Sequence, residues 1–195
     1  MNRPNRLSNT NGFSLIELLI VIAVIMLIAA IAIGGFQRMM TDMSLRATAT
    51  NINGLIHQAR IQAVKDNKAY TLKTVAAAGA NGVVLYVDLN NSGALDAGEP
   101  SIQLPKNIAV SDGTGGPAVL PAGVAIPPFI VANTVTMSFN SRGLPCSDPP
   151  VCNTISPFMI YLKQTRPSGA FGWGSLTVTR AGRIKAYTYT GSAWN

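Results

Sequence analysis

The stretch GFSLIE, residues 12–17, decides the organisation of this chain of 195 residues. It opens an apolar run that lasts to about Phe36, and a short polar leader with Arg3 and Arg6 precedes it. A carboxylate inside such a run is costly, by roughly 2.5–3.5 kcal/mol at the centre of a bilayer. The presence of Glu17 therefore indicates that this acid has a function.

The apolar run has the length of a membrane span. Residues 18–36 contain no charge and no proline, and about nineteen helical residues extend roughly 28 Å, enough to cross a bilayer core. A secretory signal has a shorter apolar core with its cleavage site at the far end. A plain single-pass anchor is the other interpretation, but it explains neither Glu17 nor the junction of Gly12 with Phe13.

The text GFSLIELLIVIAVI, residues 12–25, resembles the type IV prepilin signal of type IV pilins and type II secretion pseudopilins. The resemblance implies that prepilin peptidase cuts after Gly12, that Phe13 becomes an N-methylated N-terminus, and that Glu17 serves filament assembly. It also implies a single pass through the inner membrane and its lipid, with a periplasmic head. The chain then enters a periplasmic or extracellular helical filament of other pilins or pseudopilins. Gly34 stands where major pilins usually carry a proline.

The physical chemistry of this motif favours assembly. Cleavage gives Phe13 a positive α-amine, and Glu17 lies four residues on, on the same helix face. Glu17 is also in the first helical turn, where an acid interacts favourably with the helix dipole. In a packed filament core the acid can neutralise the amine of an adjoining copy, and a buried pair of this kind can set the register.

After the membrane-length run, apolar residues recur at intervals of three and four. This pattern predicts an amphipathic helix over residues 37–67 with one buried stripe. Asn67 is the expected end of the helix, and His57, the only histidine, is expected on its surface. The stripe consists of Leu45, Ala49, Ile52, Ile56, Ala59 and Ala63, and we expect Met39, Met40 and Met43 to extend it.

Residues 68–195 differ in composition, because glycine, proline, valine and threonine dominate them. Short alternating runs between turn residues predict six or seven strands, and residues 111–128 are expected to form an irregular loop. The predicted fold class is α+β, with a long N-terminal helix packed on a mainly antiparallel, β-sandwich-like head. The runs are YTLKTV, GVVLYVDL, SIQL, TVTMSFN, PFMIYLK, GSLTVTR and RIKAYTY.

Two stretches of the head add a second resemblance. IHQARIQAVKDNKAYTL, residues 56–72, is similar to the helix-to-strand junction of the GspH/FimT family of minor pilins and pseudopilins, and GSLTVTRAGRIKAY, residues 174–187, to its last strands. The resemblance implies a type IV pilin-like fold. The expected organisation is a prepilin leader at 1–12, a transmembrane and filament-core helix at 13–36, an amphipathic helix at 37–67 and a periplasmic β-rich head at 68–195.

The two cysteines, Cys146 and Cys152, lie in the proline-rich segment PCSDPPVCN. A disulfide is expected if the head lies outside the cytoplasm, and closing so small a loop stabilises by roughly 2–3 kcal/mol. Two unpaired thiols are the alternative.

The segment DLNNSGALDAGE, residues 88–99, has the oxygen spacing of a calcium loop. The flanking runs look like strands, so an EF-hand is excluded. The alternative to a Ca²⁺ site is a long hairpin turn, since Asp, Asn, Ser and Gly favour turns. The candidate ligands are Asp88, Asn90, Ser92, Asp96 and Glu99.

The last third of the chain is basic, whereas the whole chain carries 15 basic and 8 acidic residues, a net charge of +7. No acid follows Asp148. Gly182-Arg183-Ile184-Lys185 is similar to the basic Gly-Arg-any-Arg motif of FimT-like pilins that bind DNA for uptake. Basic side chains contact phosphates and aromatic ones stack on bases; the alternative is a solvated strand face that protects an edge. The set comprises Arg180, Arg183 and Lys185, with Phe171, Trp173, Tyr187, Tyr189 and Trp194 nearby in sequence.

These patterns favour a structural protein. We find no nucleophile–base arrangement and no phosphate loop, so an enzyme is not expected, and no cofactor is expected unless Ca²⁺ binds. The main hypothesis is a minor pilin or pseudopilin, a structural subunit of a type II secretion pseudopilus or a type IV pilus. The alternative is a DNA-binding, FimT-like minor pilin that acts in DNA uptake during natural transformation.

Overall fold

The computed structural model describes residues 13–76, 82–111, 113, 115–117, 136–147 and 151–195, without the side chains of Gly34 and Arg38. The leader, with Gly12, and most of the expected loop at 111–128 lie outside these residues. The described chain forms one helix and nine strands. It divides into two compact units, residues 1–40 and residues 41–195, which we call the head.

The helix α1 spans Leu15–Asp66. The Ser14 carbonyl accepts hydrogen bonds from the amides of Glu17, at 3.1 Å, and Leu18, at 3.2 Å, and so starts the helix. Asn67 has a left-handed φ of 52°, which ends the helix where the sequence predicts. The backbone remains helical through Gly34 and Gly35.

In the first unit the helix presents apolar surface over the predicted membrane span, with Glu17 as its one charged residue. Each large apolar side chain from Phe13 to Phe36 is at least 45% exposed. Among the described residues, one helix is long and apolar enough to cross a membrane. Because no described residue covers this surface, a membrane or other chains are expected to cover it.

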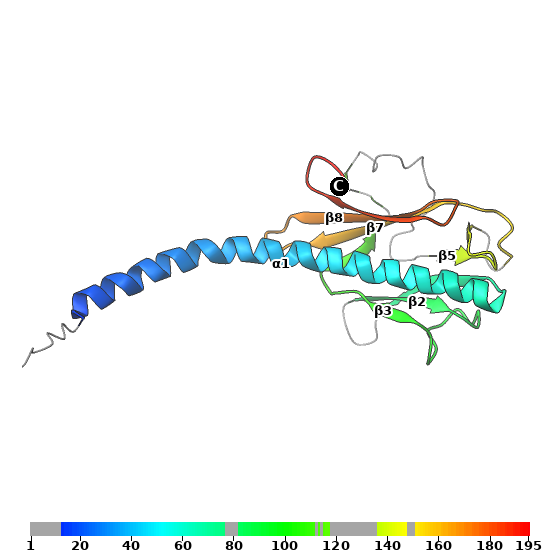
Figure 1. Cartoon of the computed structure of the whole chain (residues 1–195), viewed down its shortest axis with the longest axis horizontal. Coiled ribbons are helices and arrows are strands. Elements are labelled where there is room, and N and C mark those ends of the chain that lie inside the picture. The colour runs from blue at the N-terminus through cyan, green and yellow to red at the C-terminus, as the bar shows by residue number, and fades with distance from the viewer. Residues whose placement is uncertain (1–12, 77–81, 112, 114, 118–135, 148–150) are drawn as a thin grey trace, which may run out of the picture. The chain divides into compact units, whose positions relative to one another are not determined.

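The strands form two sheets, and every neighbouring pair is antiparallel. In the head, β2 and β3 lie on one side of α1, and β7 and β8 lie on the other (Figure 1). The five-stranded sheet has the order β3-β2-β1-β5-β6, formed by Tyr70–Ala76 (β1), Val83–Asp88 (β2), Ser101–Gln103 (β3), Thr136–Phe139 (β5) and Pro145–Cys146 (β6). The four-stranded sheet has the order β4-β7-β8-β9, formed by Ile108–Ser111 (β4), Phe158–Thr165 (β7), Phe171–Val178 (β8) and Ile184–Tyr189 (β9).

The seven predicted runs all contain strands, but the expected total of six or seven is too low. The strands β4 and β6 were missed, because four and two residues carry too little alternation to reveal a strand. Both are held by their pairing with longer neighbours.

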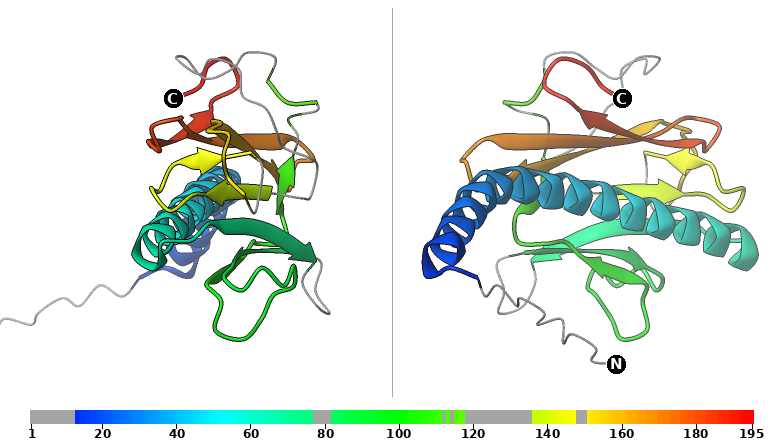
Figure 2. Two further views of the ribbon diagram at one scale, coloured as in Figure 1. Left: turned by 90° about the vertical axis from the view of Figure 1, so that its right-hand side faces the viewer. Right: turned by 60° about the vertical axis from the view of Figure 1, so that its left-hand side comes forward.

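The core lies where α1 meets the two sheets. Figure 2 shows the sheets on two sides of this helix. All six predicted stripe residues are buried, and they form one cluster with residues of both sheets. The expected extension by methionines is wrong, since Met39, Met40 and Met43 are each more than half exposed. Met43 precedes Leu45 by two residues, about 200° around the helix, and therefore faces away from the sheets.

Candidate functional site

The processing and assembly motif lies at the start of α1. Phe13 precedes the helix and is 83% exposed, and Glu17 is an exposed residue of the first turn. Ser14 and Glu17 occupy the N-cap and third positions of a capping-box pattern, in which the acid also favours the helix start. The sequence analysis predicted the favourable place of Glu17 in the first turn but missed the capping-box pairing with Ser14, which the Ser-x-x-Glu spacing reveals. Gly12 lies outside the described residues.

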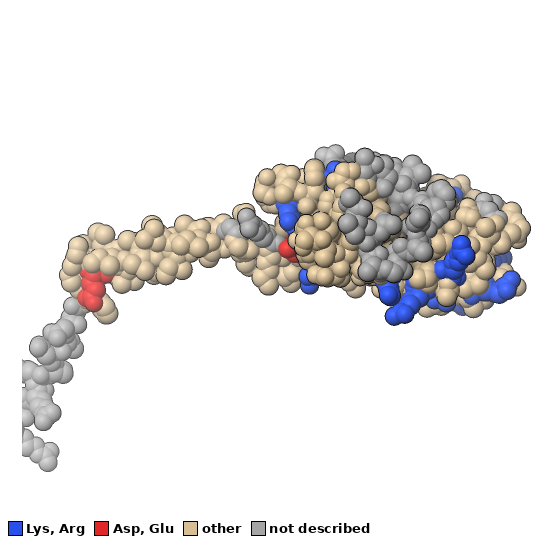
Figure 3. Space-filling view, turned by 90° about the horizontal axis from the view of Figure 1, so that it is seen from above, with Lys and Arg blue, Asp and Glu red and all other residues tan. Residues whose placement is uncertain are grey.

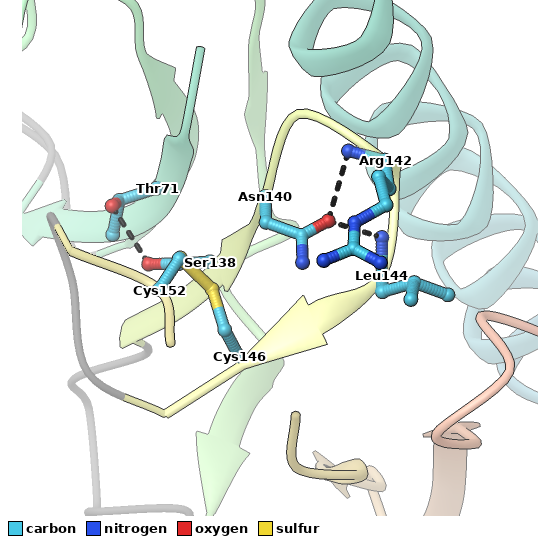
Figure 4. The surroundings of a disulfide bond; sticks show 7 residues. All are labelled: Thr71, Ser138, Asn140, Arg142, Leu144, Cys146 and Cys152. Atoms are coloured by element: carbon cyan, nitrogen blue, oxygen red, sulfur yellow. Dashed lines mark hydrogen bonds between the residues drawn. A yellow bond between two sulfur atoms is a disulfide. The ribbon is translucent and has the colours of Figure 1, made fainter. Parts of the chain in front are cut away.

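The expected disulfide is present. Cys146 and Cys152 are bonded, with their Cα atoms 5.1 Å apart, and both are buried. Figure 4 shows the bond beside β1 and β5, where the hydroxyls of Thr71 and Ser138 lie 2.8 Å apart. The bond fastens the short edge strand β6 to the chain that follows it.

The acidic loop is organised around Asp88, which is fully buried at the end of β2. Its Oδ2 lies 2.7 Å from the ammonium of Lys73, on β1, and accepts a hydrogen bond from the Gly93 amide at 3.0 Å. Its Oδ1 accepts one from the Ser92 amide at 3.1 Å. The carboxylate therefore has its charge balanced and three donors in place.

The remaining predicted ligands are also engaged. The two oxygens of Glu99 accept hydrogen bonds from the amides of Leu89, at 2.8 Å, and Asp96, at 3.0 Å. The Asp96 carboxylate accepts from Ser92 Oγ at 2.6 Å and from Asn90 Nδ2 at 2.8 Å. These two hydrogen bonds lower the pKa of Asp96 below its ordinary value, and the bond from Ser92 has the larger effect.

Calcium binding by this loop stays a prediction. Ca²⁺ needs six to eight oxygens that converge on one point, but here the oxygens of Asp88 and Glu99 point at N–H groups. In the part of the chain that the structure describes, no three acidic, histidine or cysteine side chains gather closely enough to hold a metal. In the described structure the Lys73 ammonium is the cation that faces Asp88. No local pattern in the sequence points to Lys73, which lies 15 residues before Asp88.

The basic residues of the predicted DNA motif lie on the β8–β9 turn. Thr179 closes this turn, because its carbonyl accepts from the Gly182 amide at 2.7 Å and its hydroxyl from the Arg183 amide at 3.1 Å. Arg180, Arg183 and Lys185 are all exposed. Arg183 lies in the turn and Lys185 in β9, so the structure brings the three together at one end of the hairpin.

A fourth arginine, which the sequence did not point to, lies against this turn. Arg60 of α1 donates a hydrogen bond from Nη1 to the Gly182 carbonyl, at 2.9 Å. Gly182 has φ of 78°, and a Cβ there would lie 2.9 Å from Arg60 Cζ. The positive φ favours glycine at this position, and a Cβ there would displace the Arg60 guanidinium.

Most of the aromatic residues lie elsewhere. In the β8–β9 ladder Trp173 pairs with Tyr189 at one end, whereas Lys185 pairs with Thr177 near the other. Trp173 and Tyr189 line a groove of about 720 Å³, and the Lys163 ammonium lies 3.9 Å from the ring centre of Phe171, at its wall. The expected mixture of basic and aromatic side chains is therefore divided between two ends of the sheet. The groove is also lined by Asp42, Arg46, Gly115, Gly116, Pro117, Arg166, Thr188, Thr190 and Gly191.

Comparison with known proteins agrees with the helix, the head and the motif. The family described as Type II transport protein GspH matches residues 48–182, more than half of the chain. The prokaryotic N-terminal methylation motif matches residues 7–33, which include Gly12, Phe13 and Glu17. No curated protein and no solved structure matches the chain. The chain therefore belongs to the GspH family of type IV pilin-like minor pseudopilins.

Proposed function

We propose that this chain is a structural subunit of a type II secretion pseudopilus, processed by prepilin peptidase and held in the inner membrane until it enters the filament. The family match supports secretion over a type IV pilus, since its description names type II transport. GspH-family proteins are structural subunits and not enzymes. The head lies on the periplasmic side, where its disulfide forms.

One observation carries this proposal. Among the described residues, nothing covers the apolar surface from Phe13 to Phe36, and Glu17 lies near its start, four residues after Phe13. A lipid bilayer covers such a surface before assembly, and other copies of the same kind of helix cover it afterwards. The Glu17 carboxylate then meets the α-amine of an adjoining subunit.

The first prediction concerns processing. Mass spectrometry of the native protein, purified from membranes of a host with its prepilin peptidase, should find an N-methylated N-terminus at Phe13. In a peptidase-deficient host the same protein should start at Met1. Cleavage far beyond the apolar run, in either host, would contradict the assignment, because the filament core would then be lost.

DNA binding is the second candidate function, and the exposed β8–β9 turn favours it. Arg180, Arg183 and Lys185 are not in ion pairs with any described acid. Cations on one short turn repel one another, and a polyanion relieves that repulsion. Lysine in place of the second arginine keeps the charge but loses the bidentate fork.

The second prediction tests this candidate. The full chain in micelles of an uncharged detergent should bind a labelled duplex with salt-dependent affinity. Arg183→Ala with Lys185→Ala should weaken binding at least tenfold and lower the slope of log K against log salt by about 1.8, or 0.9 for each lost phosphate contact. The matched control is Arg46→Ala with Lys106→Ala, which removes two charges elsewhere on the head. Equal losses in both variants, or no binding at low salt, would exclude a DNA site at this turn.

A further inference from the structure

A second arginine turn lies next to the first, although it belongs to the other sheet. Gly143, which follows Arg142 in the β5–β6 turn, has φ of 72°. A Cβ there would lie 3.0 Å from Arg60 Cγ and 3.0 Å from Val64 Cγ2. The stem of Arg60 therefore packs on Gly143, and its guanidinium packs on Gly182.

The two turns are built alike. In each turn a side-chain oxygen accepts a hydrogen bond from the amide four residues on: Asn140 Oδ1 from Leu144 at 3.0 Å, and Thr179 Oγ1 from Arg183 at 3.1 Å. Asn140 Oδ1 also accepts from the Arg142 amide, at 3.0 Å. The side chain of a residue before each turn thus fixes the backbone of its arginine. Figure 4 shows the Asn140 bonds and places Arg142 beside α1. Both arginine side chains are exposed, and each arginine is next in sequence to a glycine that packs on Arg60.

The charges of these turns are not balanced within the described chain. The two ion pairs there are Lys73 with Asp88 and Arg166 with Asp42, and neither involves these arginines. Arg60 is half-buried, and its single described hydrogen bond uses one of the five donors of a guanidinium. On the face drawn in Figure 3, lysine and arginine side chains gather at the end of the head where α1 ends.

We infer that Arg142 and Arg183 form one composite anion-contact surface across the two sheets, and that Arg60 is the positioning residue that holds both turns. The ligand class is the phosphodiester backbone of a nucleic acid, because guanidinium forks bind phosphate oxygens in a bidentate way, whereas Trp173 and Tyr189 lie at the far end of the β8–β9 ladder. The inference rests on the DNA-binding candidate above. It adds Arg142 and Arg60 to the residues of the sequence motif.

The experiment measures duplex binding by the full chain in uncharged micelles, for single variants at two salt concentrations. Arg142→Ala should weaken binding about as much as Arg183→Ala and lower the salt slope by about 0.9, the value for one phosphate contact. Lys106→Ala should bind as the wild type does, because Lys106 precedes β4, at the opposite edge of the sheet from β9. Arg60→Lys, which keeps the charge, should also weaken binding and should speed amide hydrogen exchange at Gly182 and Arg183.

The outcomes separate the inference from the function on which it rests. If Arg183→Ala weakens binding and Arg142→Ala does not, the composite surface is wrong while DNA binding by the hairpin stands. If Arg60→Lys binds as the wild type does, Arg60 does not position the turns. If the wild type shows no salt-dependent binding, the DNA-binding candidate and the inference are both overturned.

Discussion

Replacement of Glu17 by glutamine is expected to leave processing intact and to remove the chain from the filament. Glutamine is almost isosteric with glutamate, has a similar helix propensity, and serves equally well at the third position of a capping box. The helix that starts at Ser14 should therefore form as before. What the variant loses is the negative charge alone.

The size of the effect follows from where that charge resides in the filament. Removal of one partner from a buried ion pair costs roughly 3–5 kcal/mol, because the other charge is left unpaired in an apolar environment. Since 1.4 kcal/mol is tenfold, incorporation should fall at least a hundredfold. The measurement is the amount of the protein in sheared or detergent-resistant filaments, relative to the membrane pool.

Two controls make this result specific. Phe13 must still be the methylated N-terminus in Glu17→Gln, because otherwise the loss reflects failed processing. Ser14→Ala weakens the helix cap, by about 1 kcal/mol, without touching the charge, and should assemble nearly as the wild type does. If Glu17→Gln entered filaments normally, the ion pair between Glu17 and the α-amine would not be needed for assembly.

Sequence patterns predicted the parts of this fold that local physics specifies. The stripe from Leu45 to Ala63 follows from helical periodicity, and Asn67 ends α1 because asparagine tolerates the left-handed conformation. Leu55 is buried as well, since the sheets cover a wider face of α1 than one stripe. The prediction failed at Met43, which is apolar but lies about 200° around the helix from Leu45 and faces away from the sheets.

The site residues also divide into those that a local sequence pattern reveals and those that only the tertiary structure reveals. Glu17 and the arginines of the β8–β9 turn lie in short motifs, which a sequence displays directly. Arg60 contacts Gly182, which lies 122 residues later in the chain, and no local sequence pattern predicts such a contact. Lys73 was also missed, because its partnership with Asp88 arises only when β1 pairs with β2.

Asp88→Asn should be among the most destabilising single changes in the head. Asparagine offers one oxygen where Asp88 uses two, so its amide group must face an N–H donor from Lys73, Ser92 or Gly93. The Lys73 ammonium also loses its partner, although its side chain is 32% exposed and water compensates part of that loss. We expect a cost of about 2–4 kcal/mol in the free energy of unfolding, near the lower end for a broken buried ion pair.

Chemical denaturation of the full chain in uncharged micelles measures this cost, with Asp96→Asn as the matched control. Asp96 is in the same loop but exposed, so its substitution should change the stability by less than about 1 kcal/mol. Comparable losses from the two variants would mean that the Lys73–Asp88 pair does not organise the loop.

The same assay decides between the ammonium and a calcium ion as the cation of this loop. A ligand that binds only the folded state raises stability in proportion to RT ln(1 + [L]/Kd), so a calcium loop would be stabilised by Ca²⁺ and weakened by chelation. We expect that Ca²⁺ does not stabilise the protein, that chelation does not weaken it, and that calorimetry detects no heat of binding. The reason is that Lys73 already balances the charge of Asp88 and that Glu99 accepts hydrogen bonds from two amides. A Ca²⁺-dependent stabilisation that disappears in Glu99→Ala would reverse this conclusion, since Lys73 would then have to leave Asp88 for the ion to enter.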